Sequence, residues 1–172
     1  FLLVCTVRHL RGQGREHSSM LVHVTRFNAV QVHVHGQINE HLRQLKQRVL
    51  RRVDHERILE RLEGLWFRDF VPATAATRAA MPDAIAGEVF GWGDVASALQ
   101  DGIADIDVRM INGTAKDALD YVDRKETGLK VIAVGGDKLS RGLTLEGLSV
   151  SYFLRASRMY DTLMQMGRWF GY

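Results

Sequence analysis

The sequence predicts an α/β protein, with a parallel sheet flanked by helices. The clearest strand is Lys130–Val134, in which four apolar residues follow the lysine without alternation. A continuous apolar run of this length is typical of a strand that is buried on both faces of its sheet. Other short apolar segments alternate along the chain with longer segments of helical periodicity. Such alternation favours parallel strands that are covered by helices.

The first part of the chain predicts a strand between helical or ambiguous segments. Phe1–Leu10 is apolar enough for a helix or a strand, and its periodicity does not separate the two. Arg11–Arg15 contains two glycines and predicts a loop, and Ser19–Val24 predicts a short buried strand. A helix is predicted from about residue 29 to residue 52, because helical spacing persists there for longer than strand alternation. The apolar stripe of this helix consists of Val30, Val34, Ile38, Leu42, Leu45 and Val49.

A further helix takes in Ile58 to Trp66. Pro72 and Pro82 then flank the alanine- and threonine-rich stretch Ala73–Ala80, which predicts a flexible connection. The remaining predicted elements are a helix Asp94–Gly102, a strand Ile106–Ile111, a helix capped by Thr114 and reaching Val122, a strand Lys130–Val134, a strand Leu148–Leu154 and a helix Tyr160–Phe170.

The composition is that of a globular domain. Of the 172 residues, 46% are hydrophobic and 25% are charged, which argues against a disordered or fibrous chain. The length predicts a single domain over residues 1–172, with a helical insertion at about 37–82. The longest apolar run, Phe1–Cys5, is far shorter than the roughly 20 residues of a membrane-spanning helix. Cys5 is the one cysteine of the chain, so we expect no internal disulfide and a cytoplasmic location.

The charges are distributed unevenly along the chain. Residues 1–82 carry 13 basic and 7 acidic side chains, residues 83–126 carry 4 and 10, and residues 127–172 carry 6 and 3. A basic first half is typical of a surface that faces phosphate groups, and it is equally typical of solvated helix faces.

Several familiar sites are missing from the sequence. No G-x-x-x-x-G-K-[ST] loop occurs, since Leu143 follows Gly142 where the lysine would stand. Gly147–Ser151 lacks the closing glycine of a nucleophile elbow, and no H-E-x-x-H zinc motif is present. The carboxylates between residues 83 and 126 predict solvated acidic faces. We therefore expect no metal site in the chain.

The last third holds the candidate site. The strand that ends at Val134 runs into a glycine-rich, charged loop from Gly135 to Leu148. Open α/β sheets bind ligands where such loops leave the carboxyl ends of strands. Gly135 and Gly136 allow the backbone to approach a phosphate, and Lys138, Ser140 and Arg141 can donate hydrogen bonds to it. The alternative is a tight surface turn without a ligand.

A second candidate lies near the end of the chain, in Gln165–Tyr172. Arg168 stands on the predicted last helix directly after Gly167. An arginine presented in this way can reach the γ-phosphate of a nucleotide that another domain holds. The alternative is an ordinary surface arginine on an amphipathic helix.

Taken together, the two segments resemble motifs V and VI in the second RecA-like lobe of superfamily II helicases. Asp137–Leu145 is similar to T-D-x-x-S-R-G-I-D-I, and Gln165–Arg168 to the start of Q-x-x-G-R-x-x-R. Ser19–Val24 matches the strand of motif IV. More specifically, Ser18–Phe27 and Tyr160–Tyr172 resemble the endonuclease Z-one (Z1) domain family of bacterial helicase-like and restriction or defence systems.

This resemblance implies roles for individual residues. Gly136, Asp137, Lys138, Ser140, Arg141 and Gly142 would couple the nucleotide state to DNA, Gln165 and Arg168 would sense the γ-phosphate, and Arg26 would contact DNA. Thr144 departs from the family pattern, in which an aspartate stands near the nucleotide ribose, and the second arginine of motif VI is not in the chain.

The resemblance also implies partners that the chain does not supply. The chain opens without methionine inside an apolar segment, so we expect it to be a piece of a longer polypeptide. ATP and Mg²⁺ are expected only together with a first RecA-like lobe of that polypeptide. DNA is the expected partner, and no membrane is.

Three functions remain open at this point. The first is the second lobe of a nucleic-acid-dependent ATPase that acts on DNA in a restriction-like system. The second is a metal-dependent DNA endonuclease, as the family's name suggests. The third is a non-catalytic DNA-binding or assembly module, which the basic first half would serve.

Overall fold

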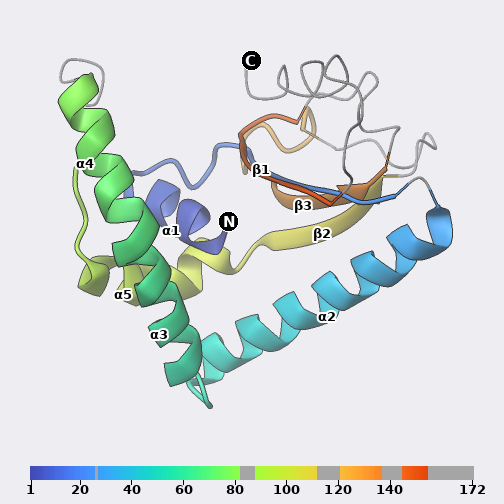
Figure 1. Cartoon of the computed structure of the whole chain (residues 1–172), viewed down its shortest axis with the longest axis horizontal. Helices are drawn as coiled ribbons and strands as arrows, with labels where there is room; N and C mark the ends of the chain where they lie inside the picture. The colour runs from blue at the N-terminus through green and yellow to red at the C-terminus, as the bar shows by residue number, and fades with distance from the viewer. Residues whose placement is uncertain (26, 82–87, 112–120, 137–144, 155–172) are drawn as a thin grey trace. The chain divides into compact units, whose positions relative to one another are not determined.

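The computed structural model describes residues 1–25, 27–81, 88–111, 121–136 and 145–154 (Figure 1). Contacts between residues divide the chain into two compact units. The sheet unit contains Phe1, residues 15–43 and the described part of residues 105–172. The helical unit contains residues 2–14 and 44–104.

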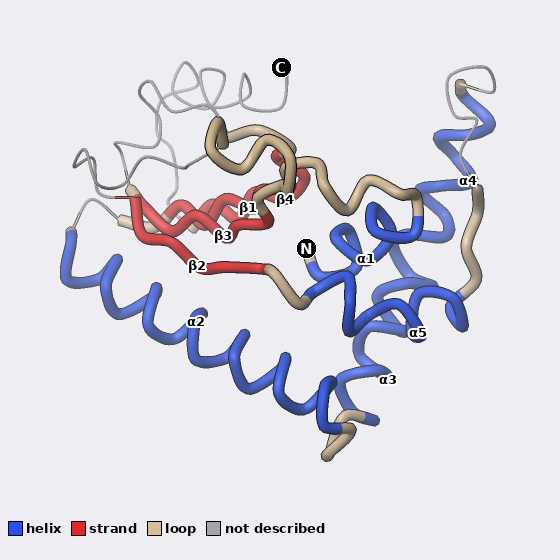
Figure 2. Tube along the Cα trace, turned by 180° about the vertical axis from the view of Figure 1, so that it is seen from behind, coloured by secondary structure: helices blue, strands red, loops and turns tan. Residues whose placement is uncertain are grey.

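The sheet unit is built on four parallel strands. They are β1 (Ser18–His23), β2 (Ile106–Ile111), β3 (Lys130–Gly135) and β4 (Leu148–Phe153). Their order across the sheet is β2-β3-β1-β4, and every neighbouring pair is parallel (Figure 2). The predicted α/β fold with a parallel sheet flanked by helices is therefore confirmed, as are all four predicted strands.

The core of the sheet unit explains why these segments become strands. All six residues of β3 are buried, as its continuous apolar run predicts for a strand between two covered faces. Burying one valine or leucine side chain contributes about 1.5–3 kcal/mol. The core cluster consists of Leu21, Ile111, Tyr121, Leu129, Val131, Ala133, Leu145 and Leu148, with Phe153 packed against it.

Helix α2 (Asn28–Arg51) agrees with the helix predicted for residues 29–52. Its predicted apolar stripe holds from Ile38 onward, since Leu42 and Val49 are buried. The first turn differs, because Val30 is 39% exposed and the neighbouring Gln31 is buried in its place. One turn later, a ring nitrogen of His35 lies 3.2 Å from the backbone oxygen of Val108 in β2, which connects this part of α2 to the sheet.

The helical unit contains α1 (Leu2–Leu10), α3 (Glu56–Leu65), the π-helix η1 (Trp66–Phe70), α4 (Val71–Ala80) and α5 (Trp92–Ile103). The ambiguous segment at the start of the chain is thus a helix. Helices α1 and α5 pack closely together, and Cys5, Val95 and Leu99 are almost completely buried. The predicted helices over Ile58–Trp66 and Asp94–Gly102 are confirmed as α3 and α5.

The flexible connection predicted for Ala73–Ala80 is wrong, because this segment is helix α4. Pro72 stands in the first helical turn, where a proline interrupts no hydrogen bond and its fixed φ suits the helix. The alanines that follow have the highest intrinsic helix propensity of any residue. The hydroxyl of Thr77 donates to the backbone oxygen of Ala73, 2.7 Å away, so the threonine also fits within the helix.

Some sequence predictions fall on residues that the structure leaves undescribed. Thr114 and the predicted helix Tyr160–Phe170 lie outside the described residues, while Tyr121 and Val122 lie in a turn. The single domain and its insertion at about 37–82 stay predictions. Within the described residues, no helix is long and apolar enough to span a membrane.

The packing of α1 on α5 depends on Gly102. A Cβ atom at this position would lie 2.6 Å from the Cα of Thr6 and 2.7 Å from its hydroxyl oxygen. We predict that Gly102→Ala lowers the free energy of unfolding by about 1–3 kcal/mol, because backbone on both helices must move. Chemical denaturation followed by circular dichroism measures this change.

Gly93 in the same helix is the matched control, since a Cβ there would meet no atom within 4 Å. Gly93→Ala should leave stability unchanged or raise it by about 0.5–1 kcal/mol, through lower backbone entropy of the unfolded chain. Equal destabilisation by the two substitutions would contradict the close α1–α5 contact.

Candidate ligand site at the carboxyl edge of the sheet

The parallel register brings one residue from each strand to the same edge of the sheet. Ile111 pairs with Gly135, Gly135 with His23, and His23 with Phe153. The pairing continues one residue further on both sides of β1. Val24 donates its N–H to the oxygen of Gly135 at 2.8 Å, and Leu154 donates to that of His23 at 3.0 Å. All four strands therefore end in one row.

The strand order makes the ends of β1 and β3 a topological switch point. The connection after β1 leads past β3 to β2, whereas the connection after β3 leads past β1 to β4. The two connections thus leave neighbouring strands in opposite directions. In open α/β sheets, ligands bind in the crevice outside the carboxyl ends of such strands.

Gly136 lies at this edge, directly after β3 and against the segment that follows β1. A Cβ atom on Gly136 would lie 2.5 Å from the backbone oxygen of Thr25 and 2.6 Å from the amide nitrogen of Gln31. Gln31 in turn donates that amide to the oxygen of Thr25 at 2.9 Å. Only glycine fits here, so the sequence at this position is dictated by a close approach of backbone to backbone.

Hydrogen bonds between Thr25 and Gln31 place the beginning of α2 at the edge. The hydroxyl of Thr25 accepts a hydrogen bond from the N–H of Phe27 at 3.2 Å, which turns the chain after β1. The oxygen of Phe27 then accepts the N–H groups of Val30 and Gln31, both at 3.1 Å, and α2 starts at Asn28. The amino end of a helix carries a partial positive charge and N–H groups without partners within the helix. An anion is the ligand that such a helix end favours.

The last residues of β1 and β4 place two stacked rings at the edge. His23 is completely buried, and its ring stacks on that of Phe153 with centroids 4.4 Å apart. Two exposed ion pairs away from the edge shift the pKa values of their members. Hydrogen bonds from Arg68 lower the pKa of Asp69, and the carboxylate of Glu40 raises the pKa of Arg43.

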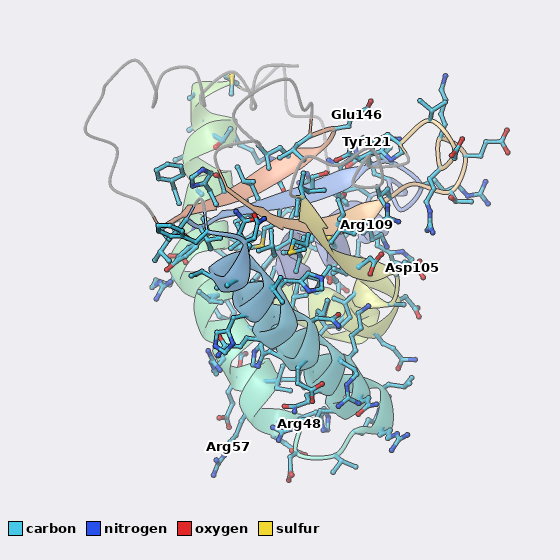
Figure 3. The ribbon with its side chains drawn as sticks, turned by 90° about the vertical axis from the view of Figure 1, so that its right-hand side faces the viewer. Arg48, Arg57, Asp105, Arg109, Tyr121 and Glu146 are labelled. Carbon is cyan, nitrogen blue, oxygen red and sulfur yellow. The ribbon has the colours of Figure 1, made fainter. Side chains whose placement is uncertain are left out.

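The amino edge of the sheet is filled by protein atoms instead. Gly147 has a positive φ of 67°, and a side chain on it would collide with the backbone of His17. The hydroxyl of Ser19 bonds the oxygen of Glu146 at 2.6 Å and the Tyr121 hydroxyl at 2.7 Å. Figure 3 shows Tyr121 and Glu146 side by side at this end. The amino edge thus serves packing, and the carboxyl edge is the candidate site.

Of the predicted site residues, Gly136 is described, and it lies directly after β3 at the carboxyl edge of the sheet. The others lie outside the described residues: Arg26, Asp137, Lys138, Ser140, Arg141, Gly142, Gln165 and Arg168. Sequence reasoning missed Gln31, which lies outside the predicted apolar stripe. A signal was present, because Gln31 begins the series Gln31, His35, Ile38 and Leu42 at helical spacing. Among the described residues, no group of three metal-ligating side chains comes together.

These features define a parallel α/β protein with a switch point between its two central strands, where the candidate ligand edge lies. A family model places it more narrowly. The Z1 domain model matches residues 1–172, and the chain belongs to the Z1 domain family. Searches of curated proteins and of solved structures each found no match.

The closeness of Gly136 to Thr25 and Gln31 gives a direct test of the edge. We predict that Gly136→Ala lowers the free energy of unfolding of the sheet unit by about 1–3 kcal/mol, because the new Cβ would meet the backbone oxygen of Thr25 and backbone must shift to make room. Thermal or chemical unfolding measures this loss.

Gly36, in the interior of α2, has open space where a Cβ would lie. Gly36→Ala should be neutral or stabilising by about 0.5–1 kcal/mol. If Gly136→Ala behaves in the same way as Gly36→Ala, the backbone approach at the edge is not as tight as described.

Proposed function

We propose that this Z1 domain is the second RecA-like lobe of a nucleic-acid-dependent ATPase, which acts on DNA in a restriction or defence endonuclease system. The observation that carries the proposal is the switch point between β1 and β3, where Gly136 meets Thr25 and Gln31. The segment that resembles helicase motif V leaves β3 at this point, and the segment that resembles motif IV leaves β1 beside it.

In this proposal the carboxyl edge binds the DNA backbone. The amino end of α2 offers N–H groups and a partial positive charge to a phosphate. Gly136 has no side chain, so the backbone at Gly136 lies directly against Thr25 and Gln31 beside this helix end. Lys138, Ser140 and Arg141 of that loop would donate further hydrogen bonds to phosphates, and Asp137 and Gly142 would shape the loop. Arg26, between Thr25 and Phe27, would add a charge-assisted contact.

The nucleotide side of the proposal involves a first lobe of the same polypeptide. That lobe would hold ATP and Mg²⁺, and the metal ion would neutralise charge on the phosphates. Gln165 and Arg168 of this chain would approach the γ-phosphate from the opposite side. An arginine there stabilises charge that develops on the transferred phosphoryl group. The loop at residues 137–142 follows directly after the edge, which would link nucleotide state to DNA binding.

The proposal predicts a large loss of activity for Arg168→Ala. In the complete protein, DNA-stimulated ATP turnover should fall about a thousandfold or more, because an arginine finger contributes at least that factor. DNA binding in the absence of nucleotide should change little, since Arg168 is assigned to the phosphate of ATP. A phosphate-release assay with and without duplex DNA measures the turnover.

Arg124, on an exposed turn of the sheet unit, is a suitable control. Arg124→Ala removes the same charge and should keep turnover within about twofold of the unsubstituted protein. Unchanged turnover in Arg168→Ala would rule out the arginine-finger role and leave the proposal without its catalytic half.

A further inference from the structure

The turn between α2 and α3 presents three arginines within five residues. They are Arg48, Arg51 and Arg52, and all three are exposed. On a helix, Arg48 and Arg51 lie about 60° apart around the axis, so they point to the same side. Arg57, in the first turns of α3, is exposed as well. Figure 3 shows Arg48 and Arg57 at the same end of the two helices, and we call these four residues the arginine tip.

The helix end itself does not require an arginine at position 52. The N–H of Val53 donates to the oxygen of Arg48 at 3.2 Å, which is the long hydrogen bond of a Schellman motif. Arg52 occupies the left-handed position of that motif with a φ of 52°. Glycine is the usual residue there, because a side chain in this conformation is strained. The chain thus keeps a guanidinium group where glycine would give the more stable turn.

The residues that the structure describes provide no bonded partner for three of these arginines. Among the described residues, the guanidinium groups of Arg48, Arg51 and Arg52 make no hydrogen bond or ion pair, in contrast to Arg43, which pairs with Glu40 at 2.7 Å. Arg48 stands three residues before Arg51 on α2, and like charges at this spacing repel each other on a helix. Both arginines also interact favourably with the partial negative charge at the carboxyl end of the helix.

Acidic and apolar groups around the tip complete its description. Asp54 follows in the same turn, and the carboxylate of Glu56 lies 3.4 Å from the ring of His55. Leu50 and Val53 are 59% and 57% exposed. In a Schellman motif the residue at the position of Val53 usually packs on an apolar side chain one turn back, yet here that position is Arg48. The tip therefore combines exposed positive charge with the exposed apolar side chains of Leu50 and Val53.

We propose that the arginine tip binds the phosphate backbone of duplex DNA, as a contact additional to the carboxyl edge of the sheet. Guanidinium groups suit this ligand because they bind phosphate oxygens with two parallel hydrogen bonds. Leu50 and Val53 then lie against the sugars between the phosphates. The inference rests on the proposed function for its DNA partner and does not depend on ATP turnover.

Fluorescence anisotropy of labelled duplex DNA tests the tip in the complete protein without nucleotide, between about 50 and 200 mM salt. Each lost phosphate contact should reduce the slope of log affinity against log salt by about 0.9. Arg52→Gly should lose one such contact. The triple variant Arg48→Ala/Arg51→Ala/Arg52→Gly should lose three, which reduces the slope by about 2.7. Leu50→Ala should weaken binding without a change in slope, because an apolar contact releases no counterion.

Arg52→Gly also separates binding from folding. Glycine relieves the strain at this position, so the variant should unfold at a higher denaturant concentration while it binds DNA more weakly. Arg124→Ala removes a charge from an exposed turn elsewhere and should leave the slope unchanged. Weaker binding in both Arg52→Gly and Arg124→Ala by the same amount would mean a general charge effect and would overturn the inference.

Three further outcomes would also overturn it. If the tip variants keep the unsubstituted slope of log affinity against log salt, the tip does not contact DNA. The proposed function would be unaffected by that result. Tip-dependent binding of phosphatidylserine vesicles with tip-independent binding of DNA would assign the surface to a membrane. If the complete protein binds no duplex DNA, the proposed function fails together with the inference, whereas a result for Arg168→Ala alone affects only the ATPase role.

Discussion

The parallel pairing of β1 with β3 on one side and with β4 on the other is the constraint on which the sheet unit depends. It aligns Ile111, Gly135, His23 and Phe153 in one row, so that all four strands deliver their following loops to a single edge. It also forces the connections after β1 and β3 to leave in opposite directions, which creates the switch point. Gly136 then permits the close approach of the backbone after β3 to Thr25 and Gln31. Fold and candidate site thus follow from the same pairing.

The sequence predicted those parts of the fold in which one pattern dominates over several turns or a whole strand. The continuous apolar run of β3 indicated a buried strand, and the long apolar stripe of α2 indicated a helix, because each pattern persists over the whole element. Phe1–Leu10 stayed open, since a short apolar segment satisfies both periods and only packing against α5 makes it a helix. Ala73–Ala80 was misjudged because its prolines were given more weight than its alanines, although Pro72 stands where a helix accepts proline.

The candidate site was predictable in its position and less so in its composition. A glycine-rich loop after a buried strand was enough to select Gly136. Gln31 was not selected, because its role depends on the hydrogen bond that it donates to the backbone oxygen of Thr25. That contact is a property of the folded chain and cannot be read from the sequence. The arginine tip shows the same limit. Three arginines in five residues are visible in the sequence, yet the strained φ of Arg52 and the exposure of Val53 are properties of the helix end.

Hydrogen–deuterium exchange of the complete protein with and without duplex DNA tests most directly whether the carboxyl edge is the ligand site. The account predicts that DNA slows exchange at the amides from Val24 to Gln31 and at Gly135 and Gly136, while peptides from the amino edge around His17 and Gly147 keep their rates. Protection confined to the amino edge, or no change at the ends of β1 and β3 in a protein that binds DNA, would contradict it.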